Sequence, residues 1–433
     1  MTLSSTTVQS VALCTYAATI LQWAPANAAN ILAVETSPCK SHWNIMRSVL
    51  RVLTDHGHTM TVFTPFADGD RDGYTEVNVE TAVRLGLTAG FMTDNFSTTR
   101  KLIINQMNDT RAGCDTIYGH RRMVEILDGS ATGEFDLVIT EPLNSECVAY
   151  VATVLRVPMI YVIRSPIIKF LERSLTGHAP NPAAVGHILS RRGVIQTFID
   201  RFINVVLTVY SSTLKWYVEQ HHRFADSRPY DDVDLVRPSV IFTNTHFIIE
   251  PARPLIPDVV QIGGVHLTTP EPIPMKVLWK YEGEFKNKPN NVMIRKWFPQ
   301  RDILFHHNVK PFISHGGISG IYEAMDAGVP VLGFPIFYDK SRNIDNLVNA
   351  RMAISMDLLS VTEKTLLNAI LEIFNNNEYQ KNADITSKRF KDRPMSPEES
   401  IVYWTEYVSR HKRVPRLKSH ALSLSWFQYF LVD

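Results

Sequence analysis

The chain has 433 residues, and 45% of them are hydrophobic, which is enough for two globular domains with substantial cores. Its formal net charge of +1 gives no electrostatic reason to expect nucleic acid as a partner. The four cysteines form no C-x-x-C pair and no cluster with metal-ligand spacing, so the sequence predicts neither a zinc site nor a disulfide scaffold.

The chain begins with an apolar stretch at residues 11–21, which is soon followed by the triplet Ala26-Asn27-Ala28. This order is typical of a cleaved signal peptide, although no basic residue precedes the stretch, so we expect residues 1–28 to be removed on secretion. An N-terminal helix of the folded protein is the alternative. The glycosylation sequons at Asn95 and Asn108 agree with secretion.

Cleavage would remove Cys14, and of the three remaining cysteines Cys114 and Cys147 are candidates for a disulfide bond. No stretch of 18 apolar residues occurs, so the sequence predicts no membrane-spanning helix. The end of the chain, residues 426–433, is aromatic in the way of membrane-interface segments. These features predict a protein of the secretory pathway without a transmembrane helix.

The first part of the chain alternates between short apolar strands and helices. A predicted strand at residues 31–36 is followed by a helix and by a strand at residues 60–63. The alternation resumes between residues 135 and 163, and it predicts a parallel sheet with right-handed crossovers. The first helix is indicated by apolar residues at the i, i+3, i+4 and i+7 positions of one face, which are Met46, Val49, Leu50 and Leu53.

A long helical stretch lies between residues 166 and about 237, and we interpret the polar segment at residues 226–238 as an interdomain linker. A second alternating series begins at residue 240. The sequence therefore predicts two doubly wound α/β domains at residues 29–237 and 238–395, followed by a C-terminal segment at residues 396–433. The predicted strands of the second series lie at residues 240–243, 259–265, 292–296, 309–314 and 331–334.

One connection between predicted strands of the second series is too short for a parallel crossover. Only about ten residues, three of them proline, separate the predicted strands at residues 259–265 and 276–281. A parallel crossover needs a dozen or more residues. Either these two strands are not neighbours in a sheet, or a β-α unit is absent.

The second half carries W-F-P-Q at residues 297–300, H-G-G at residues 315–317 and G-V-P at residues 328–330. Over more than forty positions this segment resembles the signature of the animal UDP-glycosyltransferases, which conjugate sugars to small lipophilic molecules. Ser41-His42-Trp43 resembles their N-terminal motif, and Val402–Thr405 resembles the helix that crosses back to the first domain. The resemblance implies two Rossmann-like domains facing across a cleft (the GT-B fold), an endoplasmic reticulum location, and a UDP-sugar as co-substrate without a metal or other cofactor.

The H-G-G motif has a physical reading as a diphosphate site. It is predicted to form the turn after a short strand, with a helix starting near Ser319 and Gly320. Gly316 and Gly317 let backbone amides approach a diphosphate, and the helix N-terminus adds partial positive charge. His315 can donate a hydrogen bond to the same phosphates.

The remaining donor residues lie on both sides of this turn. Trp297 offers a flat surface for uracil, and Gln300 can read its polar edge. Glu323, one turn along from Ser319, can accept both ribose hydroxyls. The resemblance places the sugar clamp at Asp339 and Lys340.

Inverting sugar transfer needs a base to take the acceptor's proton, and histidine suits this because its pKa lies near working pH. His42 follows the first strand and opens a helix, so we expect it to face the region beyond the strand ends. The family has an Asp behind this base at the end of the fourth strand. Here that position is Glu141, whose extra methylene leaves the geometry open, and Glu146 is the alternative.

The sequence departs from the family pattern in three ways. A β-α unit with a diphosphate-contacting turn is missing between Pro274 and Met275, Lys340 replaces a glutamine that can accept a hydrogen bond, and the membrane anchor is absent. Two functions therefore stay open. One is transfer of a hexosyl group, most simply glucose from UDP-glucose, to a hydroxyl of a small lipophilic acceptor, as in detoxification. The other is a catalytically impaired partner that associates with intact family members or a membrane surface.

Overall fold

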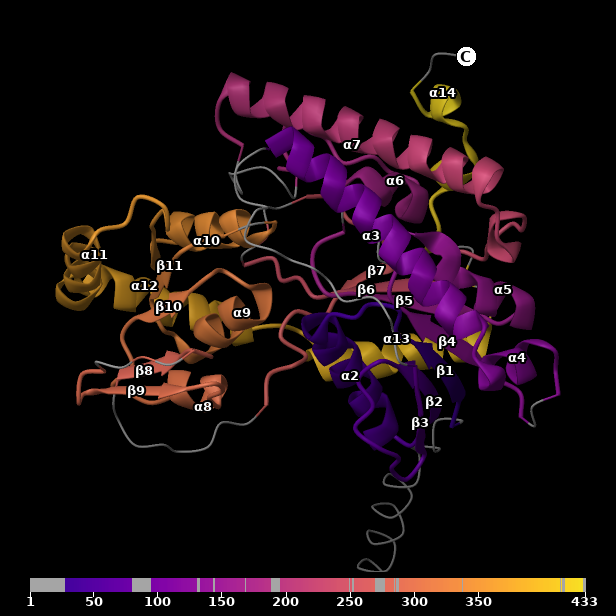
Figure 1. The fold of residues 1–433 in the computed structure, drawn as a ribbon, viewed down its shortest axis with the longest axis horizontal. Coiled ribbons are helices and arrows are strands. Elements are labelled where there is room, and N and C mark those ends of the chain that lie inside the picture. Colours follow the sequence, from indigo (N-terminus) through magenta and orange to yellow (C-terminus); the bar gives the residue numbers. More distant parts are fainter. Residues whose placement is uncertain are drawn as a thin grey trace, which may run out of the picture.

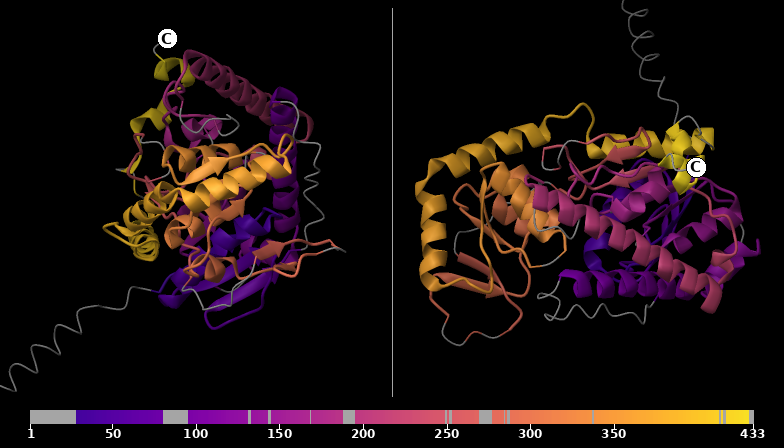
Figure 2. Two further views of the ribbon diagram at one scale, coloured as in Figure 1. Left: turned by 90° about the vertical axis from the view of Figure 1, so that its left-hand side faces the viewer. Right: turned by 90° about the horizontal axis from the view of Figure 1, so that it is seen from above.

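The computed structural model describes residues 28–79, 95–130, 133–142, 145–167, 169–187, 195–248, 250, 253–268, 277–283, 285, 288–336, 338–412, 414 and 417–430. The expected signal peptide, apart from its last residue, and the junction between Pro274 and Met275 lie outside these residues. The described chain forms a larger and a smaller α/β body, and the last long helix returns to the larger one (Figures 1 and 2).

The larger body is built on a seven-stranded parallel sheet with the strand order β3-β2-β1-β4-β5-β6-β7. The central strands β1, β4, β5 and β6 are buried along almost their whole length, as expected for a parallel sheet covered on both faces. The strands are β1 (Asn30–Val34), β2 (Thr59–Thr64), β3 (Tyr74–Asn78), β4 (Leu137–Thr140), β5 (Met159–Ile163), β6 (Val240–Thr243) and β7 (Val259–Gln261).

Helices cover both faces of this sheet (Figure 1). One face packs against α2 (Lys40–Asp55) and α13 (Pro397–His411). The long helix α7 (Phe198–Ala225) packs outside the other face, on α3 and α6. That other face is covered by α3 (Asn95–Tyr118), α4 (Arg121–Leu127), the 3-10 helix Glu146–Ala149, α5 (Tyr150–Leu155) and α6 (Lys169–Thr176).

Helix α2 forms as the apolar spacing predicts. Its four periodic residues are at most 2% exposed and pack against the sheet, so the apolar face is fully used. The chain leaves the helix through Gly57, which has a φ of +87°. A left-handed residue just after a helix end is the position that favours glycine. This helix brings His42 to the carboxyl end of β1.

The smaller body contains a parallel three-stranded sheet with the order β10-β11-β12. Its core is formed by apolar residues of α9 (Ile318–Ala327), α10 (Lys340–Asn349) and α12 (Asn377–Lys391) against β11. The strands are β10 (Phe312–Ser314), β11 (Val331–Gly333) and β12 (Ala353–Ser355), and the remaining helices are α8 (Gln300–Leu304) and α11 (Glu363–Asn375).

The expected domain boundary at residue 238 is wrong. Strand β6 pairs with β5, and β7 pairs with β6, so both extend the first sheet and do not open a second one. The segment 226–238 is also not an interdomain linker, because it joins α7 to β6 within the larger body and buries Tyr230 there. Strand periodicity cannot tell which sheet a strand joins, which explains the error.

The short interval before residue 277 is explained in part by this correction. Strand β7 belongs to the larger sheet, whereas β8 (Val277–Lys280) pairs with β9 (Val292–Arg295), so β7 and β8 are not neighbours. However, β8 and β9 form a separate two-stranded sheet and do not pair with β10. An isolated pair of strands is marginal on its own. Within the described residues, the smaller body therefore contains two separate sheets.

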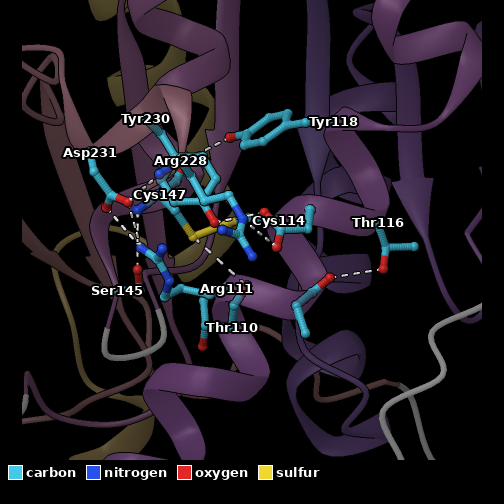
Figure 3. The surroundings of a disulfide bond; sticks show 12 residues. Thr110, Arg111, Cys114, Thr116, Tyr118, Ser145, Cys147, Arg228, Tyr230 and Asp231 are labelled. Atoms are coloured by element: carbon cyan, nitrogen blue, oxygen red, sulfur yellow. Dashed lines mark hydrogen bonds and ion pairs between the residues drawn. A yellow bond between two sulfur atoms is a disulfide. The ribbon is translucent and has the colours of Figure 1, made fainter. Parts of the chain in front are cut away.

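The disulfide between Cys114 and Cys147, a candidate from the sequence, is present and joins α3 to the 3-10 helix after β4 (Figure 3). Tyr118 reinforces the same junction, because its hydroxyl donates to the carbonyl oxygen of Cys147 at 2.7 Å. Among the three described cysteines, Cys39 is free and half-buried. Within the described ranges, no helix has the length and apolar character needed to cross a membrane.

Candidate active site

The predicted base and its carboxylate are in direct contact. His42 lies in the first turn of α2, and Glu141 is the residue after β4. Nδ1 of His42 is 2.7 Å from Oε2 of Glu141, and each residue is only 4% exposed. Sequence reasoning left Glu146 as an alternative partner, but the structure brings Glu141 to His42. The extra methylene of glutamate is therefore accommodated.

The surroundings favour neutral His42. Burial and then the positive charge of Arg164 lower the pKa of His42, while the charge and hydrogen bond of Glu141 act in the opposite direction. A neutral imidazole that donates from Nδ1 to a carboxylate keeps its Nε2 lone pair for accepting a proton. The pair is chemically suited to general-base work.

Sequence reasoning missed two residues beside this pair, Glu35 and Arg164. Each directly follows an apolar strand, β1 and β5, so a charged residue at a strand's carboxyl end was the available signal. Glu35 is 1% exposed. Asn244, which follows β6, donates its side-chain NH₂ to the carbonyl oxygen of Arg164 at 3.1 Å and fixes the backbone there.

The H-G-G turn has the predicted form at the end of β10. Helix α9 begins at Ile318 with Gly317 as its N-cap, so its first amides point outward from this turn, and Ser319 and Gly320 lie in its first turn. Gly316 has a φ of +86°, and a Cβ there would lie 2.8 Å from Ile344. Only glycine fits that position. His315 is exposed at the mouth of the turn.

Of the residues predicted to bind uridine, Gln300 and Glu323 are hydrogen-bonded to each other. The side-chain NH₂ of Gln300 donates to Oε2 of Glu323 at 2.7 Å. Burial raises the pKa of Glu323, and this hydrogen bond opposes the rise. Trp297 is 70% exposed, so its ring face is open to a stacking partner.

The Asp339-Lys340 pair lies at the start of α10, on the side that faces the base. Nζ of Lys340 is 2.8 Å from Oδ1 of Asp339, which is only 2% exposed, and the Asn343 side chain donates to the other carboxylate oxygen at 3.0 Å. Burial acts to raise the pKa of Asp339, but the charges of Lys340 and Arg164 outweigh it and hold that pKa below its ordinary value.

The two bodies meet at these residues. The guanidinium of Arg164, from the larger body, lies 5.6 Å from the ring centroid of Tyr338 in the smaller body. The charge of Lys340 acts on His42 strongly enough to help lower its pKa. The structure therefore brings the candidate base and the candidate sugar clamp together. Among the described residues, no group of three His, Cys, Asp or Glu side chains is placed to hold a metal ion.

Comparison with known proteins agrees with this geometry. The sequence model of the family described as UDP-glucoronosyl and UDP-glucosyl transferase matches residues 30–276 and 269–433. UDP-glucosyltransferase 2 of Dactylopius coccus is 31% identical over 464 aligned positions, which cover 94% of this chain and 89% of the relative. UDP-glucuronosyltransferase 2B15 of Homo sapiens is 27% identical over 91% of this chain and 87% of its own length.

Solved structures share the fold at lower identity. The calicheamicin glycosyltransferase CalG4 has a TM-score of 0.58 at 14% identity, covering 89% of this chain and 99% of that chain. The glycosyltransferase VinC, solved in complex with DTDP, has a TM-score of 0.54 at 14% identity, covering 88% of this chain and 100% of its own. The GT-B arrangement expected from the sequence is confirmed.

The alignments also bear on the short interval. The family match is split into two segments that meet at residues 269–276, with no residues of this chain left between them. The alignment with the Dactylopius enzyme has 464 positions although this chain has 433 residues, so that relative contains residues without a counterpart here. The split of the family match at residues 269–276 agrees with a gap in this chain relative to its family.

Proposed function

Because the chain belongs to the UDP-glucoronosyl and UDP-glucosyl transferase family, we propose that its site is built to transfer a hexosyl group from a UDP-sugar to the hydroxyl of a small lipophilic acceptor, with inversion. The single observation that carries the proposal is the buried 2.7 Å contact between His42 and Glu141. In this mechanism Nε2 of His42 takes the acceptor's proton as its oxygen attacks the anomeric carbon, and Glu141 stabilises the resulting imidazolium.

The donor would be held by the smaller body. The α9 amides and His315 would meet the diphosphate, Glu323 the ribose and Trp297 the uracil, while Asp339 would bind sugar hydroxyls. Glu323 must release Gln300 or share it, since the two side chains are bonded to each other. UDP-glucose is the donor we propose, and no metal or other cofactor takes part in these steps.

A second candidate function is supported by the two separate sheets that the described residues of the smaller body form. Val277, Trp279 and Tyr281 of the β8 region are 57%, 42% and 39% exposed, where a complete family member would have a further β-α unit nearby. This exposure supports a chain with an impaired donor site that acts as a binding or regulatory partner of intact relatives or at a membrane surface. The Cys114–Cys147 disulfide and the family's character support residence in the secretory pathway for either function.

The test is a transfer assay on the purified chain. UDP-glucose and UDP-glucuronic acid are each offered with a panel of phenols and alcohols, and release of UDP and formation of the β-glycoside are both measured. The matched control is His42→Gln, which keeps a hydrogen-bonding side chain but cannot act as the base. Transfer that depends on His42 supports the first function. Absence of UDP release with every donor supports the second.

A further inference from the structure

The carboxyl ends of β1 and β4 bring two glutamates side by side. Val34 and Thr140 are partners in the parallel register of these strands, so Glu35 and Glu141 are the next residues on two adjacent strands. Side chains alternate along a strand. Ala33 and Ile139, two positions earlier, both belong to the core that α2 covers. Glu35 and Glu141 therefore project to the face of the sheet that carries His42.

Glu35 has an environment that does not suit a carboxylate ion. It is 1% exposed, and its Oε1 accepts a hydrogen bond from the backbone N–H of Ser37 at 2.8 Å. Its Oε2 is buried and has no hydrogen-bond partner in the described part of the chain. A buried anion with one unsatisfied oxygen is strongly disfavoured, whereas a neutral acid is tolerated.

The charges near Glu35 are already balanced without it. The charged and titratable groups that interact with Glu35 are Glu141 from the end of β4, Arg164 from the end of β5 and the Cys39 thiol that precedes α2, and Glu141 in turn contacts His42 of α2. Glu141 and Arg164 offset each other, and His42 and Cys39 are neutral. Burial and then the charge of Glu141 raise the pKa of Glu35 well above its ordinary value, against the opposing effects of the Ser37 N–H and Arg164.

We propose that Glu35 is a positioning residue of the candidate base: it stands beside Glu141 as a neutral carboxylic acid and so leaves Glu141 as the single anion that orients the His42 ring. The inference rests on the proposed function, in which His42 is the base. When Glu35 loses its proton as pH rises, a second negative charge arises beside Glu141. Repulsion between the two carboxylates then weakens the hold of Glu141 on His42.

The first test measures the protonation state of Glu35 in the unmodified chain. Infrared spectra of ¹³C-glutamate-labelled protein at pH 7 should show the carbonyl band of a buried carboxylic acid, which is absent from Glu35→Gln. The exposed carboxyl of Glu134 provides the control, because Glu134→Gln should leave the band in place. The absence of an acid band assignable to Glu35 at pH 7 would overturn the proposal.

The second test reads His42 itself by ¹⁵N-histidine NMR, with the resonance assigned by comparison with His42→Gln. The Nδ1 proton that bridges to Glu141 should lose intensity in the unmodified chain as Glu35 ionises, and it should persist to higher pH in Glu35→Gln. The pKa of His42 should be the same in both proteins. A lower His42 pKa in Glu35→Gln would show that an anion had been removed, and would overturn the proposal.

Two further features keep these tests decisive. If Glu35→Gln does not fold, Glu35→Met removes the titrating group with an apolar side chain of similar length, and the infrared band is then assigned to Glu35 by its absence from Glu35→Met. Neither measurement uses sugar transfer.

The two proposals can also fail separately. If His42→Gln leaves transfer intact, the proposed function fails, while the protonation state of Glu35 is still determined. A change of the Nδ1 proton with rising pH that is equal in the unmodified chain and Glu35→Met would exclude Glu35 as its source.

Discussion

Nδ1 of His42 and Oε2 of Glu141 lie 2.7 Å apart, and both side chains are almost completely buried. The two residues come from different elements, the first turn of α2 and the end of β4, so their contact depends on the register between β1 and β4. Hydrogen bonding to a buried carboxylate fixes the imidazole tautomer. The fold therefore fixes the orientation of the His42 ring through its contact with Glu141.

His42→Ala should abolish most transfer. Loss of a general base costs about 10²–10⁴ in kcat. UDP affinity, measured by calorimetry in a chain that carries the missing β-α unit grafted between Pro274 and Met275, should not change, because the proposed nucleotide residues belong to the smaller body. His56→Ala is the control, since His56 is an exposed residue at the end of the same helix. Turnover of the His42→Ala protein within a factor of two of the unmodified chain would remove His42 from the mechanism.

Glu141→Gln should slow transfer and shift its pH dependence. The charge and hydrogen bond of Glu141 raise the pKa of His42, so their loss lowers it. The acid limb of kcat/KM should then move to lower pH while the plateau falls, because the imidazolium formed in the reaction is no longer stabilised. Glu141→Asp should also slow transfer, since its shorter arm withdraws the carboxylate from a 2.7 Å contact. An unshifted acid limb in Glu141→Gln would contradict the assignment.

Glu35→Gln should change the pH dependence of stability. The pKa of Glu35 is raised in the folded chain, so the folded state binds more protons than the unfolded state above the ordinary glutamate pKa of about 4.3. The free energy of unfolding therefore falls as pH rises through this window. The variant lacks this loss, so its Tm minus that of the unmodified chain should be near zero at pH 4 and increase toward pH 8. A Tm difference that is constant with pH would contradict a neutral Glu35.

Local sequence patterns predicted the helices and turns that position the site. They did not predict which strands pair with one another in a sheet. The periodicity of α2 and the turn at Gly316 follow from residue spacing, and the pairing of His42 with Glu141 was expected from the resemblance to the family, with Glu146 as the alternative. The placement of β6 and β7 does not follow from spacing, because an apolar run fits either sheet. Glu35 was also missed, since a glutamate at the end of a strand is more often solvated than buried.

Removal of the disulfide should destabilise the larger body. Cys114 and Cys147 are separated by 33 residues, and closing a loop of that size contributes about 3–4 kcal/mol in the chain-entropy view. Cys114→Ser with Cys147→Ser should lower the free energy of unfolding by about 2–4 kcal/mol in urea titrations. Cys39→Ser, which alters the free half-buried thiol, is the control and should have a smaller effect. Equal stability of the double variant and the unmodified chain would show that the bond does not form in solution.

The donor half-site is the feature that decides between an enzyme and an impaired partner. The smaller body offers Trp297, Glu323 and the α9 amides, but β8 and β9 stand apart from the three-stranded sheet. Exposed Ile313 on the edge strand β10, at 52%, and Val277 on β8 show apolar surface left uncovered beside the division. A sheet edge of this kind is normally paired or covered. The proposed nucleotide site therefore lies beside a sheet edge that is left uncovered.

UDP binding should accordingly be weak, and grafting the missing unit should restore it. A diphosphate that loses two or three charge-assisted hydrogen bonds, at about 1.5–3 kcal/mol each, binds several powers of ten more weakly. We expect little or no heat of binding when the chain is titrated with UDP, and a higher Tm together with measurable binding after the β-α unit of a close relative is inserted between Pro274 and Met275. Gly316→Ala in the grafted chain is the control, because a Cβ there meets Ile344 at 2.8 Å and should abolish the restored binding. Micromolar UDP affinity in the chain without the insert would show that its own residues complete the diphosphate site, and the impaired-partner function would then be excluded.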